Sequence, residues 1–162
     1  MNPLHIPGIG EIILRLTIAT LVGCVIGLNR DLRGKPAGLR THSLVTLGSA
    51  LLALAILHVS ITTGGVPGDA LSRVIQGIVT GIGFLGAGVI IREQSGRVSG
   101  LTTAATLWLS ASLGIVCGIG YWLPVIVAMV LIFLVLLVGG PLELFVERFF
   151  GKNNGNGDES AR

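Results

Sequence analysis

The strongest constraint on the fold is an uncharged run about as long as a bilayer is thick. Residues 74–91 carry no charged side chain, and 18 helical residues rise about 27 Å, close to the thickness of the hydrocarbon core. This run is rich in glycine, and glycine lets helix backbones approach closely in lipid. On a helical wheel one stripe holds Gly77, Gly81 and Gly88, and the opposite side holds Gly83 and Gly86. We therefore predict a transmembrane helix with neighbours on both sides, at the centre of a bundle.

The same glycines also spell G-x-G-x-x-G, the fingerprint of dinucleotide-binding folds (Gly81, Gly83, Gly86). That fingerprint requires a preceding strand and an acidic residue about 20 positions later for the ribose. The corresponding position lies near Thr106, and no carboxylate is close to it in the sequence. Helix packing is the favoured interpretation.

Composition supports a membrane protein. The chain is 51% hydrophobic and 12% charged, against about 25% charged in soluble domains. The basic residues stand between apolar runs, where they set membrane orientation rather than bind nucleic acid. The sequence predicts an all-α polytopic protein, with a transmembrane domain over residues 1–150 and a disordered cytoplasmic tail over residues 151–162.

Five spans are expected. Three cover about residues 12–28, 43–59 and 74–91. The uncharged stretch 98–142 is too long for one helix across a bilayer, and residues 118–124 break it into a fourth span and a fifth over residues 123–138. The charges favour an outside N-terminus and a cytoplasmic C-terminus. This orientation leaves only Arg15 and Arg73 outside and puts nine basic residues inside: Arg30, Arg33, Lys35, Arg40, Arg92, Arg97, Arg148, Lys152 and Arg162.

Two charged loops repeat one another. The pattern R-[DE]-x-x-G-[KR]-x-x-G-L-x-T begins at Arg30 and recurs 62 residues later at Arg92 (30 to 92, 41 to 103). Each loop follows an inward span and precedes an outward one. We predict two helical hairpins in the same orientation plus a fifth helix, a parallel repeat with an axis along the membrane normal.

These loops have two interpretations, and both stay open. In the first, the residues only anchor the chain at the surface and cap helices. In the second, the two loops form a joint cytoplasmic site that binds a partner or an anionic headgroup. The residues concerned are Arg30, Asp31, Arg40, Thr41, Arg92, Glu93, Arg97 and Thr103.

The fourth span carries a stripe of small and hydroxylated residues. It comprises Thr102, Thr106, Ser110, Gly114 and Gly118, each four residues from the last. The first span has a shorter stripe of the same kind at Ala19, Gly23 and Gly27. Helix packing is the favoured role. A polar permeation path is the alternative, but the middle of each span lacks the ionisable residues that usually mark ion routes.

The residues suggest neither an enzyme nor a cofactor site. His5, His42 and His58 fall in separate regions with no paired nucleophile, and Cys24 and Cys117 form no metal-ligand cluster. A Mg²⁺ site from Asp31 and Glu93 is conceivable, but the neighbouring arginines argue against it. We predict no catalytic, cofactor or metal residues.

Several motifs resemble the MgtC/SapB family of bacterial inner-membrane proteins. They are A-G-L-R-T from Ala37, G-I-G-F-L-G-A-G-V-I from Gly81, the pair Arg92-Glu93 and G-L-x-T-A-A-T-L-W from Gly100. The resemblance implies five membrane helices. It also identifies a short member, because longer ones continue into a soluble domain. Two positions depart from the family pattern: Asn29 precedes Arg30 where members often have an acid, and Thr102 stands where virulence members often have Asn.

The resemblance also implies a role. Family members are linked to growth at low Mg²⁺, acid tolerance, virulence and survival in macrophages, and the best-known one restrains ATP synthase. We therefore expect a regulatory protein that binds the lipid bilayer and a membrane-protein partner such as ATP synthase, and that could form homo-oligomers. The alternative is a small oligomeric transporter or channel for Mg²⁺ or another ion.

Overall fold

The structure is a computed structural model that describes residues 7–64, 67–92 and 98–150. The predicted tail over residues 151–162 lies outside these residues. Five helices carry the fold: α1 (Ile9–Leu32), α2 (Leu39–Thr62), α3 (Pro67–Val89), α4 (Leu101–Ile119) and α5 (Trp122–Phe150). All five are long and apolar enough to cross a membrane. The predicted all-α class with five spans is confirmed.

The helices extend beyond the predicted spans because their polar end turns remain helical. Glycine sets several of the boundaries: α4 begins after Gly100 and ends at Gly120, and both have positive φ (89° and 90°). Only glycine adopts this left-handed conformation at little cost. The loop predicted between α3 and α4 contains a short antiparallel ladder, β1 (Ile91–Arg92) paired with β2 (Val98–Ser99).

The chain divides into two compact units, Met1–Val125 and Ile126–Arg162. The first unit contains α1 to α4 and the second most of α5. The α5 helix is the most apolar span, with a mean hydropathy of 3.0 over Trp122–Leu142. Near its end the rings of Phe145 and Phe149 stack with centroids 4.6 Å apart.

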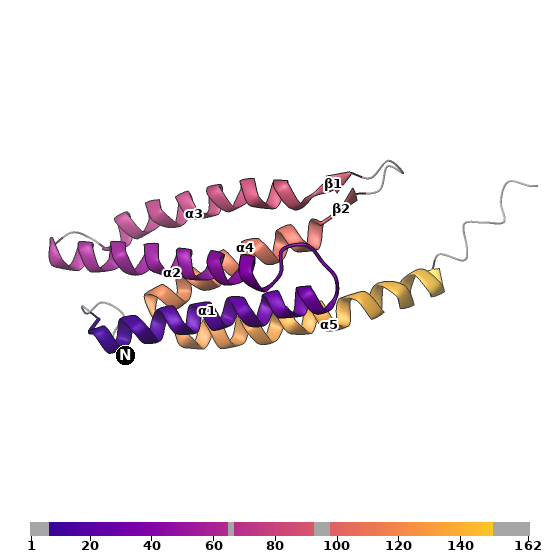
Figure 1. The fold of residues 1–162 in the computed structure, drawn as a ribbon, viewed down its shortest axis with the longest axis horizontal. Coiled ribbons are helices and arrows are strands. Elements are labelled where there is room, and N and C mark those ends of the chain that lie inside the picture. Colours follow the sequence, from indigo (N-terminus) through magenta and orange to yellow (C-terminus); the bar gives the residue numbers. More distant parts are fainter. Residues whose placement is uncertain (1–6, 65–66, 93–97, 151–162) are drawn as a thin grey trace, which may run out of the picture. The chain divides into compact units, whose positions relative to one another are not determined.

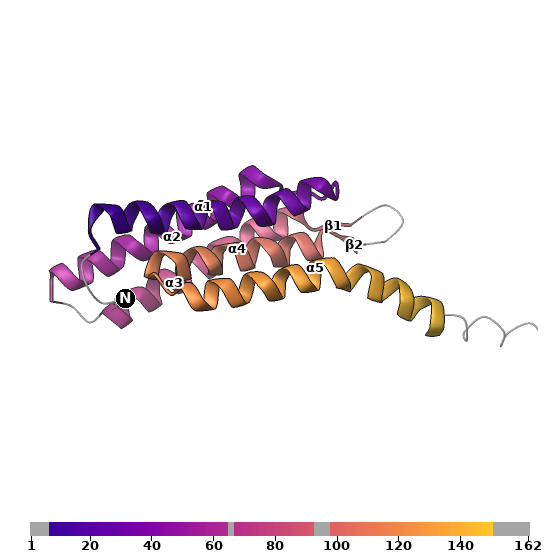
Figure 2. The ribbon, with the colours of Figure 1, turned by 90° about the horizontal axis from the view of Figure 1, so that it is seen from below.

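Within the first unit, α2 and α4 pack against each other, and each also contacts both α1 and α3 (Figures 1 and 2). The same pattern of helix contacts is obtained when α1 is exchanged with α3 and α2 with α4, as expected for two repeated hairpins. The predicted architecture of two parallel-repeat hairpins plus a fifth helix is therefore confirmed.

The expected central position of the glycine-rich helix is wrong for the described residues. Figure 1 shows α3 at one edge of the first unit, with α2 and α4 between it and α1. Only 11% of the α3 span is buried, against 56% of the α4 span. The sequence of α4 explains why α4 is more buried than α3, because Ser110, Gly114 and Gly118 let α4 approach α2 closely.

Candidate functional site

Four buried polar side chains form a connected group at one end of the first unit, here named the polar cluster. It consists of Arg30 at the end of α1, His42 in the first turn of α2, and Thr103 and Thr106 in the first turns of α4. None is more than 3% exposed. Polar groups this deeply buried need hydrogen-bond partners, so their connections define the site.

Arg30 joins the two hairpins. Its guanidinium Nη2 donates to the hydroxyl Oγ1 of Thr103 at 2.7 Å. Its Nε is buried and has no acceptor in the part of the chain that the structure describes, and the buried Oδ1 of Asn29 has no donor there. Arg30 therefore bonds to the hydroxyl that follows the second loop, and both residues belong to the predicted joint site.

His42 connects α2 with α4. Its Nδ1 lies 3.0 Å from the carbonyl oxygen of Gly38, and its Nε2 lies 3.2 Å from Thr106 Oγ1. A carbonyl can only accept, so Nδ1 carries a proton, and neutral His42 then accepts at Nε2. The Thr106 hydroxyl has a second acceptor in the carbonyl of Thr103, at 2.9 Å. Its single proton therefore has two acceptors within reach.

Asp31 has a structural role in the first hairpin. Its Oδ2 accepts from the backbone N–H of Leu39 at 2.8 Å, which satisfies a donor at the start of α2. The α2 helix begins after Gly38, whose missing side chain leaves the space that the Asp31 carboxylate occupies. Arg40 is exposed and Thr41 is half-buried.

The second loop is only partly described. Arg92 lies in β1, while Glu93 and Arg97 fall outside the described residues. The structure therefore brings together Arg30 and Thr103 of the predicted joint site. The joint site as a whole stays a prediction.

Beyond the polar cluster, α4 continues its stripe against α2. Ser110 is fully buried, and its hydroxyl has no partner among the described residues. At Gly114 a Cβ would collide with Thr46 of α2, and at Gly118 with the Ala50 backbone. Thr102, the first residue of the predicted stripe, is exposed, and the adjacent Thr103 is buried. Polar side chains therefore stop at Ser110, and direct backbone contact takes over.

The α1 stripe packs on the other side of α2. A Cβ at Gly23 would collide with Thr46 and with the backbone at His42 and Ser43, and one at Gly27 with the backbone of Leu39. Cys24 adds a contact of its Sγ to Ser43 Oγ at 3.1 Å. These close approaches fix the distance between α1 and α2.

The α3 glycines contrast with those of α1 and α4. A Cβ added at Gly77, Gly81, Gly83 or Gly88 would meet nothing within 4 Å, and at Gly86 it would make ordinary contact with Ala104 at 3.6 Å. Phe84, on the same face as the first stripe, is 82% exposed. The face formed by Gly77, Gly81, Phe84 and Gly88 is here named the glycine face.

Arg15 is a buried cation that sequence reasoning placed at the membrane surface. It is 1% exposed, its Nη1 donates to the Gly118 carbonyl at 2.8 Å, and its Nη2 pairs with Glu11 at 2.5 Å. Its guanidinium lies against Gly120, where a Cβ would collide with it. The available signal was Glu11 four residues earlier, a spacing that pairs charges on one helix face.

No metal centre is present among the described residues, since none of their His, Cys, Asp and Glu side chains form a group of three or more that could hold an ion. The fold and the site together define a polytopic membrane protein of two parallel helical hairpins joined through a buried Arg–Thr–His network. The chain belongs to the MgtC family, whose model matches residues 16–145. The resemblance to this family is thereby confirmed.

Curated relatives support the same assignment. The chain is 50% identical over 115 residues to Protein SrpB of Synechococcus elongatus, covering 67% of this chain and 63% of SrpB. It is 47% identical over 120 residues to Protein MgtC of Salmonella typhimurium, covering 74% of this chain and 48% of MgtC. The chain therefore spans about half to two thirds of the length of these relatives. No solved structure matches it.

Proposed function

We propose that this protein is a regulatory component of the bacterial inner membrane that acts by lateral contact with another membrane complex such as ATP synthase. In this proposal it supports adaptation to low Mg²⁺, acid or intracellular stress, as its family suggests, and performs no enzymatic reaction. The N-terminus lies outside and the C-terminus in the cytoplasm, which follows from the distribution of basic residues.

The observation that carries the proposal is the glycine face of α3. Small residues support helix association in lipid because they allow backbone contact. On α1 and α4 such residues are in contact with α2, whereas Gly77, Gly81 and Gly88 have open space where a Cβ would be. A packing surface without a neighbour in the first unit suits a helix of another protein.

The transporter alternative is less well supported by the same helices. The polar residues that α4 contributes to its contact with α2 end at Ser110, and Gly114 and Gly118 then touch α2 at Thr46, Ser49 and Ala50. An ion crossing between these helices would need a route through that contact. The described residues also offer no group of carboxylates for Mg²⁺, whose ligands are oxygen atoms.

Site-specific photocrosslinking in living cells tests the proposal. A photoreactive side chain at Phe84 should capture a membrane protein during growth at limiting Mg²⁺. The same side chain at Ile13 of α1, which is also exposed, is the matched control and should not capture it. Gly81→Leu should weaken the Phe84 adduct without loss of the protein from the membrane.

Liposomes provide the opposing test. Purified protein should give no saturable Mg²⁺ flux above empty vesicles. Robust flux together with no adduct at Phe84 would replace the regulatory proposal with the transporter.

A further inference from the structure

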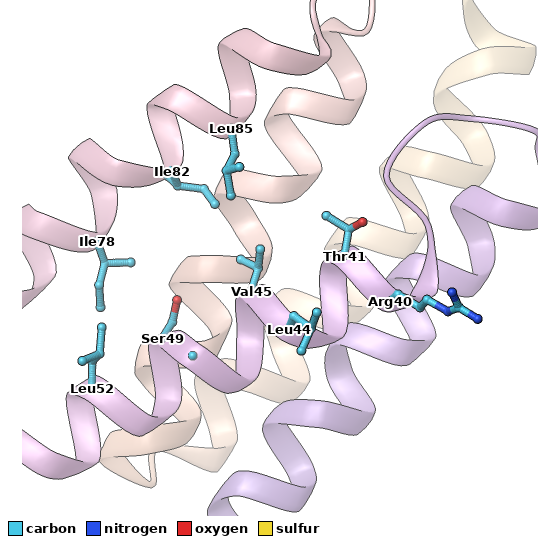
Figure 3. Close-up of a pocket in the computed structure, with 10 residues that line it drawn as sticks. Arg40, Thr41, Leu44, Val45, Ser49, Leu52, Ile78, Ile82 and Leu85 are labelled. Carbon is cyan, nitrogen blue, oxygen red and sulfur yellow. The ribbon is translucent and has the colours of Figure 1, made fainter.

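The α2–α3 pair encloses a groove that the polar cluster does not use. Its volume is about 520 Å³, and Figure 3 shows Val45 and Leu52 of α2 facing Ile78, Ile82 and Leu85 of α3. Gly48 forms part of its floor, and a Cβ there would meet nothing within 4 Å. The groove is thus an apolar surface groove along two membrane-spanning helices, at the depth of lipid acyl chains.

The residues that line this groove differ between the two repeats. At the repeat offset of 62, Leu85 corresponds to Gly23 and Leu52 to Gly114 (23 to 85, 52 to 114). Gly23 and Gly114 pack directly on α2, at Thr46 and the neighbouring backbone. Leu85 and Leu52 instead supply large apolar side chains to the lining of the groove.

The two ends of the groove differ in charge. One end carries Arg40, whose side chain extends beyond the apolar lining toward the α1–α2 loop, and Thr41 (Figure 3). No carboxylate among the described residues forms an ion pair with Arg40. At the opposite end of the same helix pair, Arg73 shares a smaller cavity with Asp69. Arg40 likewise shares a small cavity with Asp31, but the exposed Arg33 and Lys35 of the same loop give the Arg40 end a net positive charge.

We propose that this groove binds one phospholipid with an anionic headgroup. One acyl chain lies between α2 and α3, and the phosphate lies at Arg40, with the Thr41 hydroxyl as a second donor. Three observations select this occupant: the apolar lining at membrane depth, the Arg40 guanidinium at one end, and the net positive charge that the exposed Arg33 and Lys35 of the nearby loop give this end. Long cationic side chains place their charge at the headgroup layer in this way.

Native mass spectrometry of the full chain in mild detergent tests this inference, with phosphatidylglycerol and phosphatidylcholine titrated separately. Wild-type protein should retain phosphatidylglycerol about five-fold better, the ratio expected for one arginine at an anionic headgroup. Arg40→Gln should reduce retention of phosphatidylglycerol to that of phosphatidylcholine. Arg73→Gln is the charge-matched control and should leave the ratio unchanged.

A second variant tests the location of the acyl chain. Gly48→Leu places a side chain inside the groove without a clash in the empty structure, so it should reduce retention of both lipids several-fold. Gly139→Leu in α5, whose Cβ position is equally open, is the control. Equal retention of the two lipids by wild-type protein, or retention unaffected by Gly48→Leu, would overturn the inference.

Discussion

The two hairpins share one loop pattern and one helix order, yet they pack differently. In the first hairpin, α1 presses Gly23 and Gly27 onto α2 so closely that a methyl group would not fit. In the second, the positions at the repeat offset are Leu85 and Val89, and the α3 glycines face open space. Glycine therefore serves two purposes in one chain. In the first hairpin glycine allows close contact between α1 and α2, and in the second it leaves an exposed packing surface on α3.

The difference also assigns separate roles to the hairpins. The α1–α2 contact and the α4 stripe hold the first unit together around Thr46, which is fully buried. The α3 helix contributes little burial and is the natural place for interaction. Substitutions of the same kind in different parts of the two hairpins should therefore have unequal effects.

The largest effect is expected at Gly23. Gly23→Leu forces a side chain into the His42 and Ser43 backbone, which should destabilise the fold by about 3 kcal/mol. Gly81→Leu on α3 should change stability by less than about 1 kcal/mol, because its space is open and leucine favours helix. Unfolding by SDS in mixed micelles measures both. Similar losses in the two variants would show that α3 is packed as tightly as α1.

The next effect concerns the cross-hairpin hydrogen bond. Thr103→Val leaves the buried Nη2 of Arg30 without its acceptor and should cost about 2 kcal/mol. Thr41→Val, at the matching place in the first hairpin, is the control. Thr41 is only half-buried, so its loss should cost less than about 0.5 kcal/mol. SDS unfolding again provides the measurement, and a larger loss at Thr41 would reverse the assignment of roles.

A smaller effect separates two glycines with positive φ. Gly64→Ala, between α2 and α3, should cost about 1 kcal/mol for the left-handed backbone alone, because its surroundings are open. Gly120→Ala, after α4, adds a collision with the Arg15 guanidinium and should cost about 2 kcal/mol. Thermal stability in detergent compares the two. Equal shifts would mean that Arg15 moves away freely.

The smallest effect is expected at the helix starts. Asp31→Ala removes the acceptor for Leu39 N–H and should cost about 1 kcal/mol. Asp69→Ala removes a carboxylate from the first turn of α3 and should cost about 0.3 kcal/mol. Thermal stability in detergent measures both variants. A larger cost at Asp69 would show that the second hairpin depends more on its helix start than the first.

Much of the fold could be predicted from local sequence. Uncharged runs of bilayer length gave the five spans, and the recurring loop pattern gave the two hairpins, because both signals lie within a few turns of chain. The position of α3 could not be predicted this way. A glycine stripe on a helix does not show which neighbour covers it, and the neighbour depends on residues of other helices, such as Gly114 and Gly118 of α4, which pack on α2.

The candidate site was predicted less completely for the same reason. Arg30 and Thr103 were among the expected residues, but their bond crosses 73 positions in sequence. His42 was noted only as lying in a region apart from the other histidines, and the structure shows it fully buried and in contact with Thr106. Its burial depends on Gly23, whose missing side chain lets α1 close over the start of α2.

Gly100 brings the end of α3 against the start of α4, because any side chain there would strike the carbonyl of Val89. Further along α3, Ile82 is buried together with Leu107 and Ala111 of α4, while the glycine face stays open. A protein that binds the glycine face would therefore press on a helix that packs directly on α4, and a displacement of α3 would reach the first turn of α4, where Thr103 holds Arg30.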